Sequence, residues 1–300
     1  MAPAEHTPVI IECAINGVTS RAVNPNVPIE PAEIAADALA CLEAGAAIIH
    51  NHIDRVGISQ DEAVERYQEG RRPVLAARPD ALIYPTVHFP AVPLGKTISY
   101  EHLVPLAAMG LRIGVADPGS VNLGGTDADG VPSGGFVYAN SFDSIARAFE
   151  ICRDEQLGPS LAIYEPGFLR TTLAWWRAGR LPRGAMIKLY FSTERGYLGA
   201  PFGLPPTIGA LDTYLALLEG CDLPWAVSVV GGDVIASDIA RPALQRGGHL
   251  HLGLEFYGGD RTPTNVELVS EAAELCRTVG RAIATSDQAA HLLHLPRATR

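Results

Sequence analysis

The stretch Ala46-Ala47-Ile48-Ile49-His50-Asn51-His52 decides the fold, because it is a short apolar run that ends in His-x-His. Such a run, with polar residues at its end, is typical of a buried strand. Residues two apart on a strand point to the same face, so we expect His50 and His52 to project together. Two neutral imidazoles and one carboxylate are a common ligand set for a catalytic zinc with an open coordination position. The stretch therefore predicts a strand that carries two candidate metal ligands to its carboxyl end.

Short apolar runs of this kind alternate with amphipathic stretches along the whole chain. Strands are predicted at residues 9–14, 46–52, 81–87, 111–115, 160–164, 185–191, 225–230 and 249–254. Helices are predicted at residues 31–44, 61–78, 99–109, 141–155, 167–179, 206–219, 234–245 and 264–279. Eight strands, each followed by a helix, are the count of an α/β fold of the (β/α)8 TIM-barrel type.

Signals at the helix ends support this assignment. Glu30-Pro31 opens the first predicted helix and Gly45 ends it, while Gly280 ends the eighth. A doubly wound open sheet is the alternative. It usually carries a glycine-rich phosphate turn after its first strand, and Ile15-Asn16-Gly17-Val18-Thr19 does not match that turn.

The chain contains no linker, repeat or low-complexity segment that would divide it. We therefore expect one barrel domain over residues 1–300, with a short C-terminal helix at 287–293 packed against it. Residues 117–135, rich in Gly, Asp and Pro, are the longest stretch without periodicity. Its length predicts a mobile active-site segment.

Composition restricts the partners and the compartment. A net charge of −10 argues against nucleic acid and anionic membranes, which both need a positive field. No apolar run reaches the roughly 20 residues of a membrane helix, and residues 1–6 lack the start of a signal peptide. The five cysteines are odd in number and form no Cys-x-x-Cys pair, which favours a reducing compartment. We expect a cytoplasmic protein.

The locally basic segment from Arg170 to Lys188 is interpreted as a solvated helix face.

A carboxylate for the predicted metal site stands near the other end of the chain. The last predicted strand, in Gly248-His249-Leu250-His251-Leu252-Gly253-Leu254-Glu255, ends at Glu255. In a barrel the second and eighth strands both flank the first, so His50, His52 and Glu255 are expected to meet over one rim, where barrel enzymes place their chemistry. The alternative is a set of hydrogen-bonded polar side chains without a metal. His251 shares the strand parity of Glu255 and is a candidate for orienting a ligand or binding substrate, whereas His249 is interpreted as a satisfied interior histidine.

These residues resemble a known family, the β-keto acid cleavage enzymes. The resemblance covers almost the whole chain and rests on Gly45 before His50-x-His52, Gly247-Gly248-His249 before Glu255, Asn16-Gly17, Tyr164-Glu165, Gly119-Ser120-x-Asn122, Trp225-Ala226-Val227, and Asn265 with Glu267. It implies a zinc-dependent (β/α)8 barrel, commonly a homotetramer. It also implies condensation of a β-keto acid with acetyl-CoA, followed by release of acetoacetate and a new CoA thioester.

The resemblance also assigns roles to residues of this chain. It implies that His50, His52 and Glu255 are the zinc ligands. Thr86 falls where the family places a substrate hydroxyl, and Glu165 falls on an active-site glutamate. The chemistry agrees, because a β-keto acid can chelate a cation through its keto and carboxylate oxygens, and a Lewis acid there acidifies the carbon between them.

The chain departs from the family at the general base. The family has Arg where this chain has His251, and it has an Asp directly after the zinc glutamate where this chain has Phe256, which cannot accept a proton. Asp260 and Arg261, in the loop that follows, are candidates to fold back over the metal. His251 or Asp117 is the alternative base.

The predicted substrate contacts depart from the family as well. A family acid that pairs with an amino-substituted substrate is replaced by Thr19, so a cationic substrate is not expected. His88 and Phe89 follow the third strand and are interpreted either as pocket lining or as loop packing. Further predicted contacts to the keto acid or to CoA are Asn16, Asp117, Ser120, Gly231 and Gly232. The two glycines precede the predicted seventh helix, a place where barrels often bind phosphate.

Two other functions remain open at this point. A metal-dependent hydrolase of the amidohydrolase type also uses His-x-His in a barrel, but there the pair ends the first strand and an Asp ends the eighth. The second alternative is a barrel that binds a carboxylate or acyl ligand without turning it over, since the family's Arg and Asp are both missing.

Overall fold

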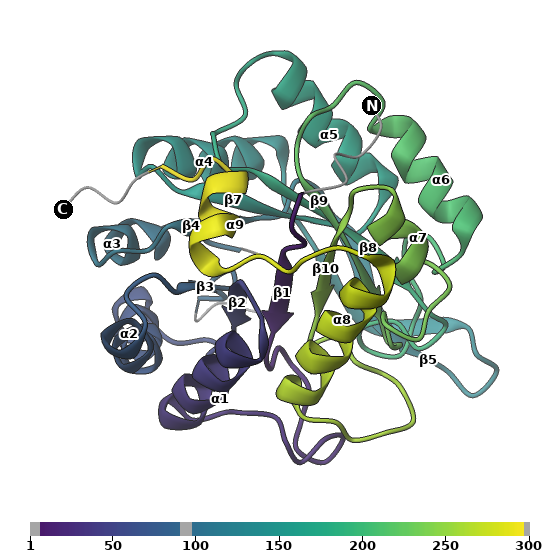
Figure 1. The fold of residues 1–300 in the computed structure, drawn as a ribbon, viewed down its shortest axis with the longest axis horizontal. Helices are drawn as coiled ribbons and strands as arrows, with labels where there is room; N and C mark the ends of the chain where they lie inside the picture. The colour runs from purple at the N-terminus through teal and green to yellow at the C-terminus, as the bar shows by residue number, and fades with distance from the viewer. Residues whose placement is uncertain (1–6, 91–97, 297–300) are drawn as a thin grey trace.

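The computed structural model describes residues 7–90 and 98–296. Its eight barrel strands are β1 (Ile11–Ala14), β2 (Ile48–Asn51), β3 (Leu82–Pro85), β4 (Ile113–Ala116), β7 (Gly158–Ile163), β8 (Met186–Ser192), β9 (Trp225–Val230) and β10 (His249–Leu252). They pair in parallel in the order β3-β2-β1-β10-β9-β8-β7-β4. β3 and β4, at the two ends of this order, lie against each other and nearly close the ring (Figure 1). The predicted (β/α)8 barrel is confirmed.

A helix follows each barrel strand. The helices are α1 (Pro31–Ala44), α2 (Gln60–Ala77), α3 (Leu103–Ala108), α4 (Phe142–Asp154), α5 (Pro166–Arg177), α6 (Ile208–Leu217), α7 (Ala240–Gln245) and α8 (Asn265–Val279). They surround the sheet in Figure 1. Within the described residues, no helix is long and apolar enough to cross a membrane.

The predicted helix-end signals are confirmed at α1 and α8. Glu30 and Glu33 form a capping box at the start of α1, Pro31 occupies its first turn, and Gly45 ends it with φ 118°. Gly280 ends α8 with φ 81°. These glycines adopt a left-handed conformation that strains other residues, which is why the helices stop there.

The C-terminal helix α9 (Ser286–Leu292) covers the amino-terminal end of the barrel. Ser286 Oγ donates a hydrogen bond to the main-chain oxygen of Ala47, which directly precedes β2, at 2.9 Å. The predicted packing of this helix against the barrel is confirmed. The extent of the domain over residues 1–300 stays a prediction, because both chain ends, including the residues 1–6 used to argue against a signal peptide, lie outside the described residues.

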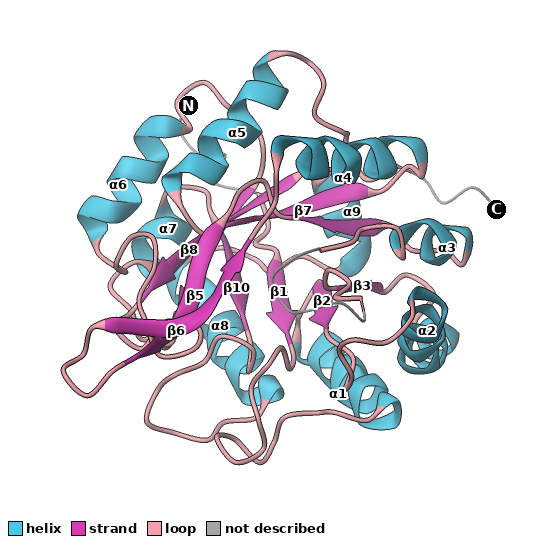
Figure 2. Ribbon diagram, turned by 180° about the vertical axis from the view of Figure 1, so that it is seen from behind, coloured by secondary structure: helices cyan, strands magenta, loops and turns pink. Residues whose placement is uncertain are grey.

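The prediction that residues 117–135 lack regular structure is wrong. This segment contributes to an antiparallel hairpin of β5 (Val121–Thr126) and β6 (Pro132–Tyr138). Asp127 closes its turn, because its Oδ1 accepts hydrogen bonds from the main-chain N–H groups of residues 129 and 131. Figure 2 shows the hairpin at the end of the barrel opposite α9.

The prediction that Lys188 lies on a solvated helix face is also wrong. Lys188 is in the middle of β8 and is only 2% exposed. Its neighbours along the strand are apolar and equally buried. The ammonium group therefore belongs to the barrel interior, where it needs a partner.

Candidate metal centre

The main chain of His52 is fixed by Asn16, which follows β1. Asn16 Oδ1 accepts a hydrogen bond from the N–H of His52 at 2.8 Å, and its Nδ2 donates to the carbonyl of His52 at 3.1 Å and to that of Pro28 at 3.1 Å. Asn16 is therefore engaged in positioning a candidate ligand. Its predicted contact with substrate stays a prediction.

Glu255 reaches the same place through a turn and not along a strand. β10 ends at Leu252, two residues before the predicted end. Gly253 follows with φ 126°, and a Cβ at this glycine would lie 2.2 Å from the main-chain oxygen of Ala14. The same oxygen accepts a hydrogen bond from the N–H of Glu255 at 3.2 Å. The turn therefore folds over β1 and brings the carboxylate toward β2.

Three side chains meet where these segments converge. His50 Nε2 lies 3.5 Å from Glu255 Oε2, and His52 Nε2 lies 3.1 Å from Glu255 Oε1. One donor atom from each residue lies within 4.8 Å of the others. Donors about 2.1 Å from one tetrahedral zinc ion are roughly 3.4 Å apart, so this arrangement is of the right size.

Unsatisfied polar atoms mark the same cluster. His52 Nε2 and Glu255 Oε2 are buried and have no hydrogen-bond partner in the described part of the chain. Buried polar atoms without partners are costly, and a divalent cation between them would bind both. The residues present therefore fit a metal ion.

The electrostatics suit the same state. Burial lowers the pKa of His50 well below its usual value, which leaves the imidazole neutral. Burial alone raises the pKa of Glu255, but the neighbouring His52 and His50 outweigh it and bring the pKa to about 2. A neutral His50 and an ionised Glu255 are in the protonation states that a metal ion requires of these two ligand types.

Two further residues hold Glu255 in place. Tyr197, in the loop after β8, donates its hydroxyl to Glu255 Oε1 at 3.1 Å. Thr19 Oγ1 donates to the carbonyl of Leu254 at 2.8 Å, so this predicted substrate contact supports the turn that carries the glutamate. Sequence reasoning missed Tyr197, because its loop has no periodicity.

A buried polar network lies inside the barrel. Lys188 Nζ donates to Glu12 Oε1 at 3.2 Å and to the hydroxyl of Tyr84 at 2.7 Å. Tyr84 also pairs with Ser160 Oγ at 3.0 Å, and its ring lies 4.6 Å from that of His50. The network therefore supports the ring of His50, which is one of the candidate ligands. Sequence reasoning missed the members of this network.

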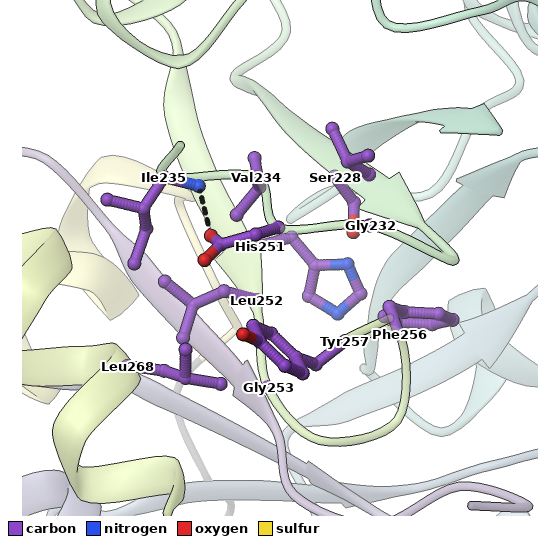
Figure 3. A pocket seen from close by; sticks show the side chains of 12 residues that line it. Ser228, Gly232, Val234, Ile235, His251, Leu252, Gly253, Phe256, Tyr257 and Leu268 are labelled. Carbon is purple, nitrogen blue, oxygen red and sulfur yellow. Dashed lines mark hydrogen bonds between the residues drawn. The ribbon is translucent and has the colours of Figure 1, made fainter. Parts of the chain in front are cut away.

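His251 lies in this interior and is fully buried. Its ring stacks on Tyr190 at 5.5 Å and meets Phe256 edge-on at 5.1 Å, and Figure 3 shows the imidazole directed toward Phe256. Burial lowers its pKa well below the usual value, so the ring is neutral. His251 therefore packs in a buried aromatic cluster with Phe256 and Tyr190.

The predicted folding of Asp260 and Arg261 over the metal is not what the structure shows. The Asp260 side chain is 94% exposed and pairs with Arg195 at 3.3 Å. Arg261 forms two hydrogen bonds to Glu271 on α8, at 2.7 and 2.8 Å. Each charge has a partner outside the barrel mouth, so neither is drawn inward.

The remaining predicted active-site residues lie around the barrel mouth or close to it. Glu165, at the start of α5, accepts a hydrogen bond from the N–H of Gly203 at 2.9 Å. Thr86 directly follows β3, and its carbonyl accepts from His102 at 2.8 Å. The His88 ring pairs with the carbonyl of Ile58 at 3.1 Å, which is the loop packing considered as one alternative.

The predicted phosphate contacts at Gly231 and Gly232 have a structural role in the main chain. The N–H of Gly231 donates to the carbonyl of Phe256 at 2.9 Å, and the carbonyl of Gly232 accepts from Gly258 at 2.8 Å. Helix α7 begins only at Ala240, not at the predicted residue 234. Residues 234–239 form turns, and Asp233 Oδ1 accepts hydrogen bonds from the N–H groups of residues 235 and 236. The two glycines anchor the turn after Glu255, and no helix begins beside them. Ser120 Oγ is likewise bonded to the main chain, accepting from the N–H of Asn140 at 2.9 Å.

Asp117 directly follows β4 at the carboxyl end of the barrel and is 5% exposed. Its Oδ2 accepts a hydrogen bond from the hydroxyl of Tyr138 at the end of the hairpin. Its Oδ1 is buried and has no partner among the described residues. Burial raises the pKa of this carboxyl to about 6, although the Tyr138 hydrogen bond and the charge of Lys188 act in the opposite direction.

Solved structures share this fold at low sequence identity. The apo structure of ObcA superposes with a TM-score of 0.70 at 15% identity, over 90% of this chain and 66% of that chain. Dihydropteroate synthase from Yersinia pestis superposes with a TM-score of 0.50 at 15% identity, over 91% of this chain and 93% of that chain. At such identities the likeness concerns the fold alone.

Proteins of known activity match along nearly the whole chain. A 3-keto-5-aminohexanoate cleavage enzyme from Fusobacterium nucleatum is 25% identical over 96% of this chain and 98% of its own. A 3-oxoadipate:acetyl-CoA acetyltransferase from Cupriavidus necator is 26% identical over 96% of this chain and 95% of its own. A 3-dehydrocarnitine:acetyl-CoA trimethylamine transferase from Rhizobium meliloti is 23% identical, over 96% of each chain. The family model described as beta-keto acid cleavage enzyme matches residues 8–295. The chain belongs to the β-keto acid cleavage enzyme family.

Proposed function

We propose that this protein is a zinc-dependent acyltransferase and C–C lyase, which condenses a β-keto acid with acetyl-CoA and releases acetoacetate and a new acyl-CoA. His50, His52 and Glu255 would hold the zinc ion. The observation that carries the proposal is the convergence of these three donor side chains at the barrel rim, with one buried polar atom of each left unpaired among the described residues. Family membership supports the reaction class.

A zinc ion at this site would supply a Lewis acid for the keto group of the substrate. The protein's own residues hold the site in shape and exclude water. Tyr197 and the Gly253 turn fix Glu255, Asn16 fixes His52, and the Tyr84 ring supports His50. A site held this firmly needs little reorganisation when charge develops on the keto oxygen.

The side chain of the keto acid is the part that differs among the relatives. Their names specify amino-substituted, dicarboxylic and trimethylammonium substrates. In this chain Thr19 hydrogen-bonds to the main chain and offers no carboxylate for a cation. We propose a keto acid without a cationic group.

The direct test is turnover by zinc-loaded protein. Protein stripped with a chelator and reloaded with zinc would be mixed with acetyl-CoA and a panel of neutral and anionic β-keto acids, and acetoacetate and acyl-CoA would be measured. The proposal predicts both products in equal amounts, and a loss of at least about 100-fold in His52→Ala. The exposed His291 of α9 offers the matched control, so His291→Ala is expected to keep full activity.

The other outcomes each point to another function. Hydrolysis of a lactone or amide without CoA would support a hydrolase of the amidohydrolase type. Tight binding of a keto acid without product would support a non-catalytic binding barrel. A cytoplasmic homotetramer is part of the proposal, and light scattering of the purified protein tests the subunit number.

A further inference from the structure

The proposed reaction requires a base to take a proton from the carbon between the keto and carboxylate groups. Phe256 occupies the position directly after Glu255 and carries no group that can accept a proton. Its ring packs on Tyr190 at 5.1 Å and on Tyr197 at 5.9 Å, so it fills space at the mouth. The base must come from another element, and this inference rests on the proposed function.

Two of the candidate bases named from the sequence do not suit this role. Asp260 is 94% exposed and lies outside the mouth beside Arg195. His251 is fully buried beneath Phe256, between the Phe256 and Tyr190 rings. Its Nε2 lies 3.4 Å from Glu12 Oε1, in the buried network inside the barrel.

Asp117 has the position and the free acceptor atom that a base needs. It lies at the carboxyl end of β4, which is the end of a barrel that carries the chemistry. Tyr138 holds one carboxylate oxygen, which fixes the group's orientation, and the other oxygen is buried without a partner in the part of the chain that the structure describes. The N–H of Asp117 donates to the hydroxyl of Tyr100 at 3.4 Å, which holds the backbone as well.

We propose that Asp117 is the general base of this enzyme, acting through Oδ1. The C–H bond at the α-carbon breaks, its proton bonds to Oδ1, and the electron pair forms the C=C bond of an enolate with the negative charge on the keto oxygen. The enolate carbon then bonds to the carbonyl carbon of the acetyl thioester, the keto C=O bond re-forms, and the C–S bond breaks to release the CoA thiolate. The thiolate adds to the keto carbon of the substrate, and the bond between that carbon and the α-carbon breaks. This gives the acyl-CoA and an acetoacetate enolate, which takes the proton back from Oδ1. The acid that the family resemblance places directly after Glu255 would be replaced here by one after the fourth barrel strand.

The surroundings leave Asp117 as the group that titrates near neutral pH on its side of the mouth. The titratable and charged groups facing it are Tyr100, Tyr138, Tyr164, Tyr190, Lys188 and Glu255. Burial raises the pKa of all four tyrosines well above 10, and Glu255 is ionised. A carboxylate with a pKa of about 6 is ionised at pH 7 and basic enough for the proton transfer.

Proton exchange tests the role of Asp117 apart from overall turnover. Zinc-loaded protein and a β-keto acid that it cleaves would be incubated in D2O without a thioester, and exchange at the α-carbon followed by NMR. Asp117→Asn keeps the shape and an oxygen that can accept from Tyr138. We expect it to slow exchange and cleavage at least 100-fold while zinc content and keto acid affinity stay within threefold. Asp129, exposed in the turn of the same hairpin, provides the control Asp129→Asn, expected to match the wild type.

Tyr138→Phe separates a base from a structural residue. The Tyr138 hydrogen bond lowers the pKa of Asp117, so its loss is expected to raise that pKa. The acid limb of the pH profile of kcat/KM, with its midpoint near pH 6 in the wild type, should then move to higher pH, and the rate should recover there. A purely structural role would lower the rate at every pH without moving the limb.

The outcomes separate this inference from the proposed function. Exchange and cleavage within threefold of wild type in Asp117→Asn, or an unmoved limb in Tyr138→Phe, would overturn the inference while cleavage by the wild type still upholds the function. If the wild type neither exchanges nor cleaves any keto acid, the proposed function fails and the inference falls with it.

Discussion

At the scale of single residues, Gly17 makes room for the metal glutamate. A Cβ on Gly17 would lie 2.2 Å from Glu255 Cγ, and the residue has φ 58°. We expect Gly17→Ala to displace the carboxylate, to weaken zinc binding at least about tenfold and to destabilise the fold by about 1–3 kcal/mol. Competition with a chromophoric chelator and thermal unfolding would measure both effects.

Gly167 is the matched control for this substitution. It lies in α5, and a Cβ there would meet nothing within 4 Å. Gly167→Ala is expected to leave zinc affinity unchanged and to be neutral or stabilising by up to about 1 kcal/mol. Equal zinc affinity in the two alanine variants would show that Glu255 is not the ligand.

The ionised Asp117 carboxylate that serves the reaction is expected to lower the free energy of unfolding. Its pKa is about 6 against an ordinary 3.8, so the folded protein binds this proton more tightly than the unfolded chain does. The stability that this proton provides is present below about pH 4 and is lost as the pH rises to about 6. At pH 8 we therefore expect Asp117→Asn to raise the free energy of unfolding by about 1–3 kcal/mol. Urea unfolding at pH 8 and at pH 4.5 should show a larger gain at the higher pH, and a loss at pH 8 would contradict this account.

Residue types and spacing predicted the candidate ligands but not their support. His50, His52 and Glu255 could be named because ligand chemistry needs few side-chain types. Tyr197 could not, since its loop carries no periodic signal. Glu12 and Lys188 did leave a signal, because each is a charge within an apolar strand, and two opposite charges on buried strands indicate an internal ion pair.

At the scale of elements, the hairpin β5–β6 positions the proposed base. Gly135 in β6 has φ 79°, and a Cβ there would lie 2.0 Å from the main-chain oxygen of Leu123. Gly135→Ala is expected to force the two strands apart and to release Tyr138 from Asp117. The acid limb of kcat/KM should then move to higher pH with unchanged zinc content.

The neighbouring Gly134 controls for backbone strain in the same hairpin. It also has a positive φ, 68°, but a Cβ there meets nothing within 4 Å. Gly134→Ala should leave the acid limb in place. An identical shift in both variants would mean that strain, and not the Tyr138 contact, controls the pH profile.

Sequence periodicity did not predict the segments in which glycines determine the path of the main chain. Glycines on both strands hide the alternation of polar and apolar residues in 121–138, so periodicity does not predict the hairpin. Likewise, β10 ends early because Gly253 turns the chain. Barrel strands and their helices, in contrast, have apolar runs and end signals that identify them directly.

At the scale of the whole molecule, the buried pair of Glu12 and Lys188 links opposite parts of the barrel. The pair joins β1 to β8, and Tyr84 adds β3. Lys188→Met leaves the buried Glu12 carboxylate without its positively charged partner and is expected to cost about 3–5 kcal/mol in urea unfolding. Replacing both charges, in Glu12→Gln with Lys188→Met, should recover most of this loss. A double variant as unstable as the sum of the single variants would contradict the pairing.

The barrel architecture could be predicted by counting strands and helices, because eight alternating strand–helix units commonly close into a (β/α)8 barrel. What counting could not give was the base, since its identity depends on which loops fold over the mouth.

The central claim is that His50, His52 and Glu255 bind one zinc ion, and metal analysis of the isolated protein tests it most directly. Elemental analysis after gentle purification and dialysis should find one zinc ion per chain in the wild type and in His291→Ala, and almost none in His52→Ala. No zinc above background in the wild type, or equal zinc in all three proteins, would contradict the claim.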